Sequence, residues 1–390
     1  MATEKTPEAD PARAADQLEA TVPIRGVAVR RAVDALPPYS AGRSARDALT
    51  HGRWTGPIAA LAANEGPYGP FPNAIEALQA RIATVNRYPE SGFMTLREAL
   101  ARHLALPIER IAVAAGGIAV IHHISLALLE RGDEIIQGSP TFHAYELDAR
   151  KLGARTVAVG VKPDGGYDLD GMREQIGRRT RLIYVCNPNN PTGGIVRRGE
   201  LLRFVKSVPE HVAVLIDEAY FEYAEDPDYP DTARDPAFHL PNLLTLRTFS
   251  KAYGLAGLRV AYVAGSPKIV EALGKVQSNY EVTSLSQVAA VASLENPTEL
   301  QRRRALNRAG RATLIAGLQR LGYQPLPSHA NFVCVRVGDA RQLAAALESR
   351  GVVIRPLDAM GDPASIRITV GTEVEIRQAL AALAAVSSPH

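Results

Sequence analysis

Three apolar runs of the sequence each end close to a polar side chain that could do chemistry. These side chains are Asn190, Asp217 and Lys251, with Tyr220 shortly after Asp217 and Arg259 shortly after Lys251. In an open α/β sheet the carboxyl ends of the parallel strands share one edge, and ligands bind there. We therefore expect an amide, a carboxylate, a phenol, an amine and a guanidinium to meet at one edge of a sheet.

The carboxylate and the amine indicate one kind of cofactor chemistry. Asp217 follows the apolar residues 212–216, so it is partly desolvated and needs a cationic partner to stay ionised. The protonated ring nitrogen of pyridoxal 5′-phosphate (PLP) is such a partner, and its protonation makes the ring an electron sink. Lys251, with Arg259 nearby, is expected to have a lowered pKa and to be the neutral amine that a Schiff base requires.

Other residues of the same segments could bind the phosphate. Ser250 and Arg259 suit a phosphate dianion, and Gly116 and Gly117 present free amides at the start of a predicted helix. Each feature alone has an ordinary alternative, because such an Asp often caps a helix and a Gly pair often forms a tight turn. PLP chemistry is indicated by the ordered set, which is 187–193 (NPNNPTG), 217–220 (DEAY) and 250–259 (SKAYGLAGLR).

Longer motifs surround these residues in the same order. They are 61–70 (LAANEGPYGP), 86–90 (NRYPE), 186–193 (CNPNNPTG), 217–220 (DEAY), 248–259 (TFSKAYGLAGLR), 330–333 (ANFV) and 367–372 (RITVGT). With them the sequence resembles the fold-type I PLP-dependent aminotransferases, in the branch of histidinol-phosphate and bacterial aromatic amino-acid aminotransferases. The resemblance extends from about residue 55 to the end of the chain.

The resemblance implies a role for each matching residue. Lys251 would form the Schiff base and move the proton between the substrate and the cofactor, with Asp217 and Tyr220 as the other catalytic residues. Phe142 would stack on the cofactor ring. Tyr88 would reach the phosphate in the neighbouring subunit, which implies a homodimer with shared active sites. The implied cofactor-binding set is Gly116, Gly117, Phe142, Asn190, Asp217, Tyr220, Thr248, Ser250, Lys251, Arg259 and Tyr88.

Substrate recognition is less closely specified. The resemblance implies Tyr68, Asn64, Arg355 and Arg367 as substrate-binding residues, with Arg367 as the clamp on the α-carboxylate. Residues 116–119 (GGIA) lack the acidic pair usual in this family, which favours an aromatic or other large hydrophobic amino acid over histidinol phosphate. Residues 279–281 (NYE) stand where we expect an apolar pocket wall, and His143 follows Phe142 directly.

Two other functions stay open at this point. An aminotransferase-like enzyme of a specialised pathway could catalyse β-elimination, as a C–S lyase does, or decarboxylation-linked oxidation, because no motif reports which substrate bond stands perpendicular to the ring. A PLP-sensing regulator would need a basic helix-turn-helix domain before the matching region. The residues ahead of it are only mildly basic, and they do not predict one.

The elements that must position these residues alternate along the chain. Helical spacing covers 74–85, 95–106 and 120–131, and short β-rich runs lie at 111–114, 134–137, 156–159, 182–185, 212–217, 243–246 and 260–263. This pattern predicts an α/β fold with a mostly parallel central sheet flanked by helices, and the resemblance implies PLP-dependent transferase fold type I. We expect a disordered tail (1–20), an N-terminal arm (21–60), a large PLP-binding domain (61–290) and a smaller C-terminal α/β domain (291–390).

Composition excludes several classes of function. The 390 residues carry a formal net charge of +3 with dispersed basic residues, so we expect no nucleic-acid binding. The two cysteines, Cys186 and Cys334, lie in apolar runs and predict neither a disulfide framework nor a metal site. No signal-peptide core and no apolar run long enough for a membrane span is visible, so we expect a cytoplasmic protein.

Overall fold

The computed structural model describes residues 29–37, 54 and 56–387. The expected tail at 1–20 and most of the expected arm at 21–60 lie outside these residues. The chain divides into two compact units, Met1–Pro38 and Tyr39–His390. The described part of the first unit holds a short helix, α2 (Arg31–Asp34), and everything that follows concerns the second unit.

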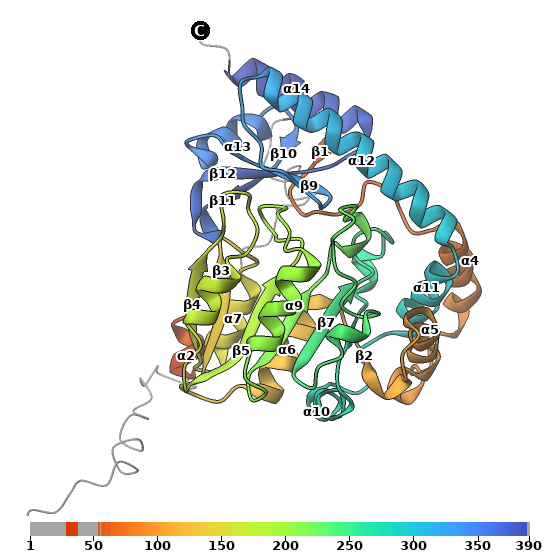
Figure 1. Ribbon diagram of the computed structural model, residues 1–390. Helices are drawn as coiled ribbons and strands as arrows, with labels where there is room; N and C mark the ends of the chain where they lie inside the picture. The colour runs from red at the N-terminus through yellow and green to blue at the C-terminus, as the bar shows by residue number, and fades with distance from the viewer. Residues whose placement is uncertain (1–28, 38–53, 55, 388–390) are drawn as a thin grey trace, which may run out of the picture. The chain divides into compact units, whose positions relative to one another are not determined.

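A seven-stranded sheet forms the centre of the second unit (Figure 1). The strand order is β2-β8-β7-β6-β5-β3-β4, and the pairs from β7 to β4 are all parallel, whereas β8 is antiparallel to both of its neighbours. The inner strands are rich in apolar residues and are buried on both faces, as expected for a sheet covered on both sides. The strands are β2 (Ile111–Ala114), β3 (Glu134–Ser139), β4 (Arg155–Gly160), β5 (Thr180–Cys186), β6 (Ala213–Asp217), β7 (Leu243–Thr248) and β8 (Ala261–Ala264).

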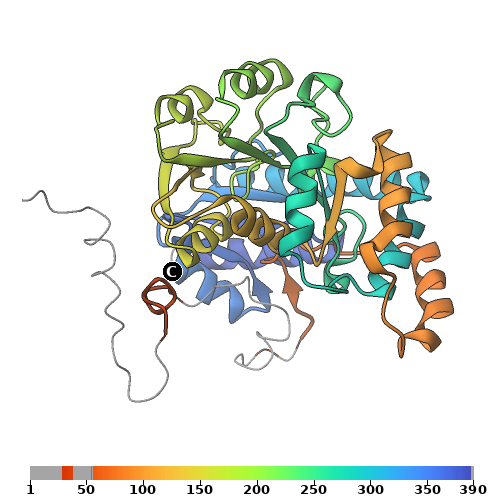
Figure 2. The same ribbon diagram turned by 90° about the horizontal axis from the view of Figure 1, so that it is seen from below.

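Helices cover both faces of this sheet, as Figure 2 shows from below. One face carries α6 (Gly117–Leu128), α7 (Ala144–Lys151) and α10 (Pro267–Val276), and the other carries α8 (Leu169–Glu174) and α9 (Arg198–Ser207). Beside the β2 edge lie α4 (Pro72–Arg81), α5 (Met94–Leu104) and α11 (Ser284–Leu294), which pack against one another. The resulting layers confirm the predicted α/β class.

A smaller sheet is built from the last part of the chain. Strands β9 (Phe332–Arg336) and β11 (Arg355–Leu357) both pair antiparallel with β12 (Asp362–Thr369), and β1 (Ala59–Ala60) pairs in parallel with β10 (Val352–Val353). Three helices pack around these strands: α12 (Pro297–Arg320), α13 (Ala340–Glu348) and α14 (Glu373–Ser387). A separate apolar core lies here, and Ala59 and Leu61 also belong to it, while the domain boundary near residue 290 stays a prediction.

The predicted helices and strands occur close to their expected positions. Helices α7 to α11 were not predicted individually, and the sequence of α11, SLSQVAAVASL, is rich in Ala and Ser and shows only a weak apolar periodicity. Within the described residues, no helix is both long enough and apolar enough to span a membrane.

Candidate active site

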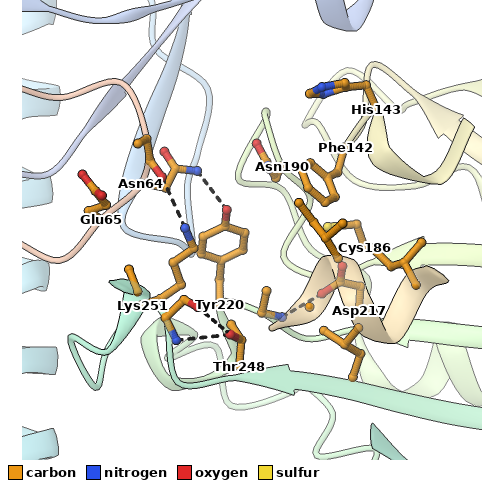
Figure 3. A pocket seen from close by; sticks show the side chains of 18 of the residues that line it. Asn64, Glu65, Phe142, His143, Cys186, Asn190, Asp217, Tyr220, Thr248 and Lys251 are labelled. Carbon is orange, nitrogen blue, oxygen red and sulfur yellow. Dashed lines mark hydrogen bonds between the residues drawn. The ribbon is translucent and has the colours of Figure 1, made fainter. Parts of the chain in front are cut away.

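A cavity of about 380 Å³ lies at the carboxyl ends of β5, β6 and β7, beside the start of α6. Figure 3 shows Lys251 and Asn64 on one side of it and Asp217 on the other, with Tyr220 between them. Most residues singled out from the sequence line it. They are Asn64, Gly117, Phe142, Asn190, Asp217, Tyr220, Thr248, Ser250, Lys251, Arg259, Arg355 and Arg367.

Asp217 is the last residue of β6 and is buried. Its Oδ2 accepts a hydrogen bond of 2.6 Å from the hydroxyl of Tyr145, and its Oδ1 accepts one of 3.0 Å from the backbone N–H of Ala219. Burial nevertheless raises the pKa of this carboxyl, because desolvation outweighs both hydrogen bonds. A cationic group in the cavity would stabilise the ionised form, as the sequence argument required.

Lys251 lies in the turn after β7, with its Nζ 3.3 Å from the carbonyl oxygen of Ala63, to which it donates a hydrogen bond. Burial, together with Arg367 and Arg259, lowers the pKa of this amine to about 8, against the opposing effect of Glu65. A substantial fraction is thus neutral near physiological pH, and a neutral amine is the nucleophile that carbonyl chemistry needs.

The floor of the cavity is suited to an anion. Gly116 has a positive φ of 89°, and a Cβ at this position would lie 2.2 Å from Nη2 of Arg259, so the guanidinium approaches the bare backbone directly. Helix α6 begins at Gly117 with its free amides. Nη1 of Arg259 donates to the Ser250 hydroxyl at 3.4 Å, and the Thr248 hydroxyl lies 3.0 Å from that of Ser250.

The polar groups around the middle of the cavity bind one another. The Asn64 side-chain amide donates a 2.9 Å hydrogen bond to the Tyr220 hydroxyl, and Arg367 donates to the side-chain oxygen of Asn190. Phe142 lies above Asp217 in Figure 3, with its ring edge-on to Tyr145 at 5.6 Å. An apolar ring face and hydroxyl and amide groups therefore surround the space between Lys251 and Asp217.

Two buried arginines form the side of the cavity contributed by the smaller sheet. Arg355 on β11 and Arg367 on β12 are directly opposite each other in the antiparallel register. Arg367 also donates a 2.6 Å hydrogen bond to the carbonyl oxygen of Ala62. Burial, together with Arg355 and Arg367, lowers the pKa of the nearby His143 to about 4, so its imidazole is neutral at physiological pH.

The residues present fit PLP group by group. The buried carboxylate of Asp217 could bind the ring nitrogen, and the amine of Lys251 could react with the aldehyde. The glycine, hydroxyl and arginine groups at the floor of the cavity could bind the phosphate. The sequence model of the protein family "Aminotransferase class I and II" matches residues 57–383. This chain belongs to that family.

Relatives and solved structures agree with this assignment. The chain is 41% identical to an aromatic amino acid aminotransferase of Mycobacteroides abscessus, over 87% of this chain and 93% of that protein. It is 39% identical to histidinol-phosphate aminotransferase 1 of Cupriavidus pinatubonensis, over 90% and 94%. The structure of the histidinol-phosphate aminotransferase from Sinorhizobium meliloti in complex with pyridoxal-5′-phosphate superimposes with a TM-score of 0.83 and 27% identity, covering 92% and 97%. The chain is thus a PLP-dependent aminotransferase of fold type I.

Two predicted site residues of this aminotransferase lie away from the cavity within one chain. The Tyr88 side chain is 80% exposed and stacks on Tyr280, with 4.7 Å between ring centroids. Tyr68 borders a separate small cavity together with Arg303. Their predicted roles at a cofactor and a substrate therefore require a second subunit or a movement of the chain.

Residues 279–281 were expected to form an apolar pocket wall, but within one chain Glu281 contacts polar groups instead. The Glu281 carboxylate accepts hydrogen bonds from the backbone N–H of Ala115 at 3.0 Å and from Gln277 at 2.9 Å, and it lies 3.2 Å from His123 Nε2. His122 in turn pairs with Asp148 at 3.0 Å. Glu281 thus secures the backbone just before the glycine cradle.

Sequence reasoning missed Tyr145, the hydroxyl partner of Asp217. The residue follows Phe142 by less than one helical turn, but Tyr145 and Asp217 lie 72 residues apart in the sequence. A tyrosine inside an apolar helix face is most often a packing residue, so no local signal distinguished it.

Proposed function

We propose that this aminotransferase moves the α-amino group of an aromatic or other large hydrophobic L-amino acid to a keto acid. The lining of the cavity supports an apolar substrate, because it includes Ile118, Ile121, Phe142 and Met360. The names of several relatives near 40% identity, aromatic amino acid aminotransferases, support the same class of donor.

The residues of the chain have separable tasks in this proposal. Asp217 holds the cofactor's ring nitrogen in its protonated form, and PLP bound in this way withdraws electrons from the substrate α-carbon. Lys251 would hold the cofactor covalently at rest, and its Nζ, set free when the substrate's amine takes its place, would accept the proton from the α-carbon. Tyr220 and Asn190 hold the ring's phenolic oxygen, while Thr248, Ser250, Arg259 and the glycine cradle hold the phosphate.

The observation that carries the substrate proposal is the buried guanidinium of Arg367, which lines the same cavity as the amine of Lys251. Arg367 lies at the same cavity as Lys251 and lowers the pKa of its amine, so both groups act on one small space. A guanidinium binds a carboxylate through two parallel hydrogen bonds, which would orient an α-amino acid with its amine toward Lys251.

Histidinol phosphate is the second candidate donor, and Arg355 favours it. This guanidinium stands across the strand register from Arg367 and lines the same cavity, so it supplies a second cation that a phosphate could use. Two of the relatives are named histidinol-phosphate aminotransferases.

A homodimer with shared active sites is part of the proposal. Tyr88 and Tyr280 form an exposed aromatic pair. Exposed aromatic side chains that stack on each other are typical of a surface that another protein covers. We also propose a cytoplasmic location, since Cys186 and Cys334 are free thiols, as expected in a reducing compartment.

A half-reaction tests the proposal. Holoenzyme is mixed with phenylalanine, tyrosine, histidinol phosphate or an S-alkyl cysteine, and the cofactor absorbance and the product mass are followed. Conversion to the pyridoxamine form with phenylpyruvate or its tyrosine analogue supports an aromatic donor. Reaction with histidinol phosphate alone selects the second candidate, and product without pyridoxamine would mean elimination or decarboxylation instead.

A further inference from the structure

Another cavity, of about 280 Å³, lies against the face of β7 that points away from the active site, and we call it the second cavity. Leu246 and Thr248 of this strand border the active-site cavity, whereas Arg247 between them borders the second one. This arrangement follows from the alternation of side chains along a strand. The second cavity is therefore separated from the first by the strand itself.

Two residues of opposite charge that line this cavity each have a buried polar atom with no hydrogen-bond partner among the described residues. The Glu222 side chain is 7% exposed, and its Oε2 has no hydrogen-bond partner among the residues that the structure describes. The buried Nε of Arg304 likewise has none within the described part of the chain. Both residues line the cavity, and no ion pair between them is found among the described side chains. A native protein rarely leaves such atoms unsatisfied, so they indicate a bound group.

The other charged groups of the cavity already have partners. Arg247 pairs with Glu218 and Asp231, each at 2.7 Å. Arg234 donates to the carbonyl oxygen of His103 at 2.6 Å, and Asp226 pairs with Arg197 outside the lining at 3.0 Å. The groups that a ligand would have to satisfy are therefore the Glu222 carboxylate and the Arg304 guanidinium.

These two groups select the chemistry of the ligand. A simple cation would meet the repulsion of Arg304, and a simple anion would meet that of Glu222, whereas a zwitterion satisfies both. Beside the charged groups that already have partners, the wall includes Phe221, Tyr253, Tyr262 and Leu300. The volume is at the small end of ligand pockets and well above the roughly 30 Å³ that a water occupies in the liquid.

We propose that this cavity binds a free α-amino acid, with its ammonium group on Glu222 and its carboxylate on Arg304. Burial raises the pKa of Glu222 to about 7, as expected for a carboxyl that gains from a cationic partner. The site is distinct from the substrate site, and its existence does not depend on the proposed function.

Ligand binding here would reach the active site through a short stretch of backbone. Glu222 lies in the 3₁₀ turn Phe221–Tyr223, and this turn follows directly after Tyr220, which lines the active-site cavity. Arg247 also connects the two regions, because it pairs with Glu218, the neighbour of Asp217. An amino acid in the second cavity is thus placed to regulate the enzyme.

The test measures binding of radiolabelled L-alanine, L-phenylalanine and L-glutamate by equilibrium dialysis. The holoenzyme is first reduced with borohydride, which fixes the cofactor on Lys251 and removes amino-acid chemistry from the active site. We expect one of the three to bind at about one molecule per chain. Its N-acetyl derivative and its methyl ester, which lack the ammonium and the carboxylate charge, should bind at least about tenfold more weakly.

Variants locate the site. Glu222→Gln and Arg304→Gln should each weaken binding about tenfold or more. Glu225→Gln and Arg308→Gln alter a neighbouring ion pair outside the cavity lining, and they should bind as the unmodified protein does. Glu222→Gln removes an unpaired buried charge, so it should not unfold the protein.

Two results would overturn the proposal. No binding of any of the three amino acids to the reduced enzyme would mean that the cavity holds water only. Binding that survives both Glu222→Gln and Arg304→Gln would place the amino acid elsewhere. If borohydride leaves the absorbance unchanged, the cofactor assignment fails, and the dialysis result still reports on the second cavity.

Discussion

The hydroxyl of Tyr145 offers a sharp test of how the aminotransferase holds its cofactor. It donates a 2.6 Å hydrogen bond to Asp217, and both side chains are buried. Replacing Tyr145 with Phe removes one oxygen and keeps the ring, which stacks on Tyr184 with 4.3 Å between centroids. The change therefore isolates the hydrogen bond from the packing.

The expected magnitude follows from the charge on Asp217. A hydrogen bond to a charged group contributes about 1.5–3 kcal/mol. This bond opposes the effect of burial on the Asp217 carboxyl, so its loss raises the pKa of that carboxyl further. The ionised form that holds the ring nitrogen then becomes less favourable, and PLP should bind about tenfold to a hundredfold more weakly. Turnover at saturating PLP should also fall, because the ring nitrogen is held protonated less often.

Tyr184→Phe is the matched control for this experiment. Its hydroxyl lies 3.2 Å from that of Ser125, and its ring belongs to the same stack. The dissociation constant of PLP is measured by titrating apoenzyme, and kcat is measured at saturating PLP. If Tyr145→Phe matches Tyr184→Phe in both quantities, the hydroxyl does not tune Asp217, and the reasoning from burial is wrong.

Four further expectations concern the same site and its support. Lys251→Ala should abolish turnover and the absorbance of the covalently held cofactor; an active variant would exclude Lys251 as the attachment residue. PLP attachment to apoenzyme should accelerate as pH rises, with a midpoint near 8, since the lowered pKa of Lys251 makes its amine neutral above that value; a midpoint near 10 in stopped-flow absorbance would contradict this. Arg367→Ala should raise KM for the amino donor by the equivalent of about 2–4 kcal/mol, and an unchanged KM would place the carboxylate elsewhere. Glu218→Gln should lower the free energy of unfolding in urea by about 3–5 kcal/mol, because it leaves the 1% exposed Arg247 short of a buried partner; a loss below about 1 kcal/mol would refute that estimate.

The strands that end at the active site were predictable because they are short apolar runs followed by turn residues. Once β5, β6 and β7 are parallel neighbours, Asn190, Asp217 and the Lys251 turn must share an edge. The predicted class is confirmed for that reason, while the roles of the individual residues stay proposals.

The sequence could not predict hydrogen bonds and ion pairs between residues that are far apart along the chain. The Ala63 carbonyl that accepts from Lys251 is 188 residues away in the chain, and the Arg247–Glu218 pair spans 29 residues. Spacing within an element indicates which face a residue takes, but it does not indicate which distant side chain meets it. The same limit applies to Glu222 and Arg304, whose shared cavity exists only after α12 has packed against the turn at Phe221–Tyr223.

Burial acts on Asp217 and Lys251 in opposite directions, and together these effects explain why the site suits PLP. Desolvation raises the pKa of the Asp217 carboxyl and lowers the pKa of the Lys251 amine. Without a cofactor, burial therefore makes the charged form of each group less stable than it is in water. A cofactor with a protonated ring nitrogen gives Asp217 the positive partner that it lacks, and it consumes the neutral amine that burial favours. Arg259 and the start of α6 would hold its phosphate, so the negative charge would also lie where the fold presents positive potential. PLP binding should therefore stabilise the folded chain by relieving costs that burial has already imposed.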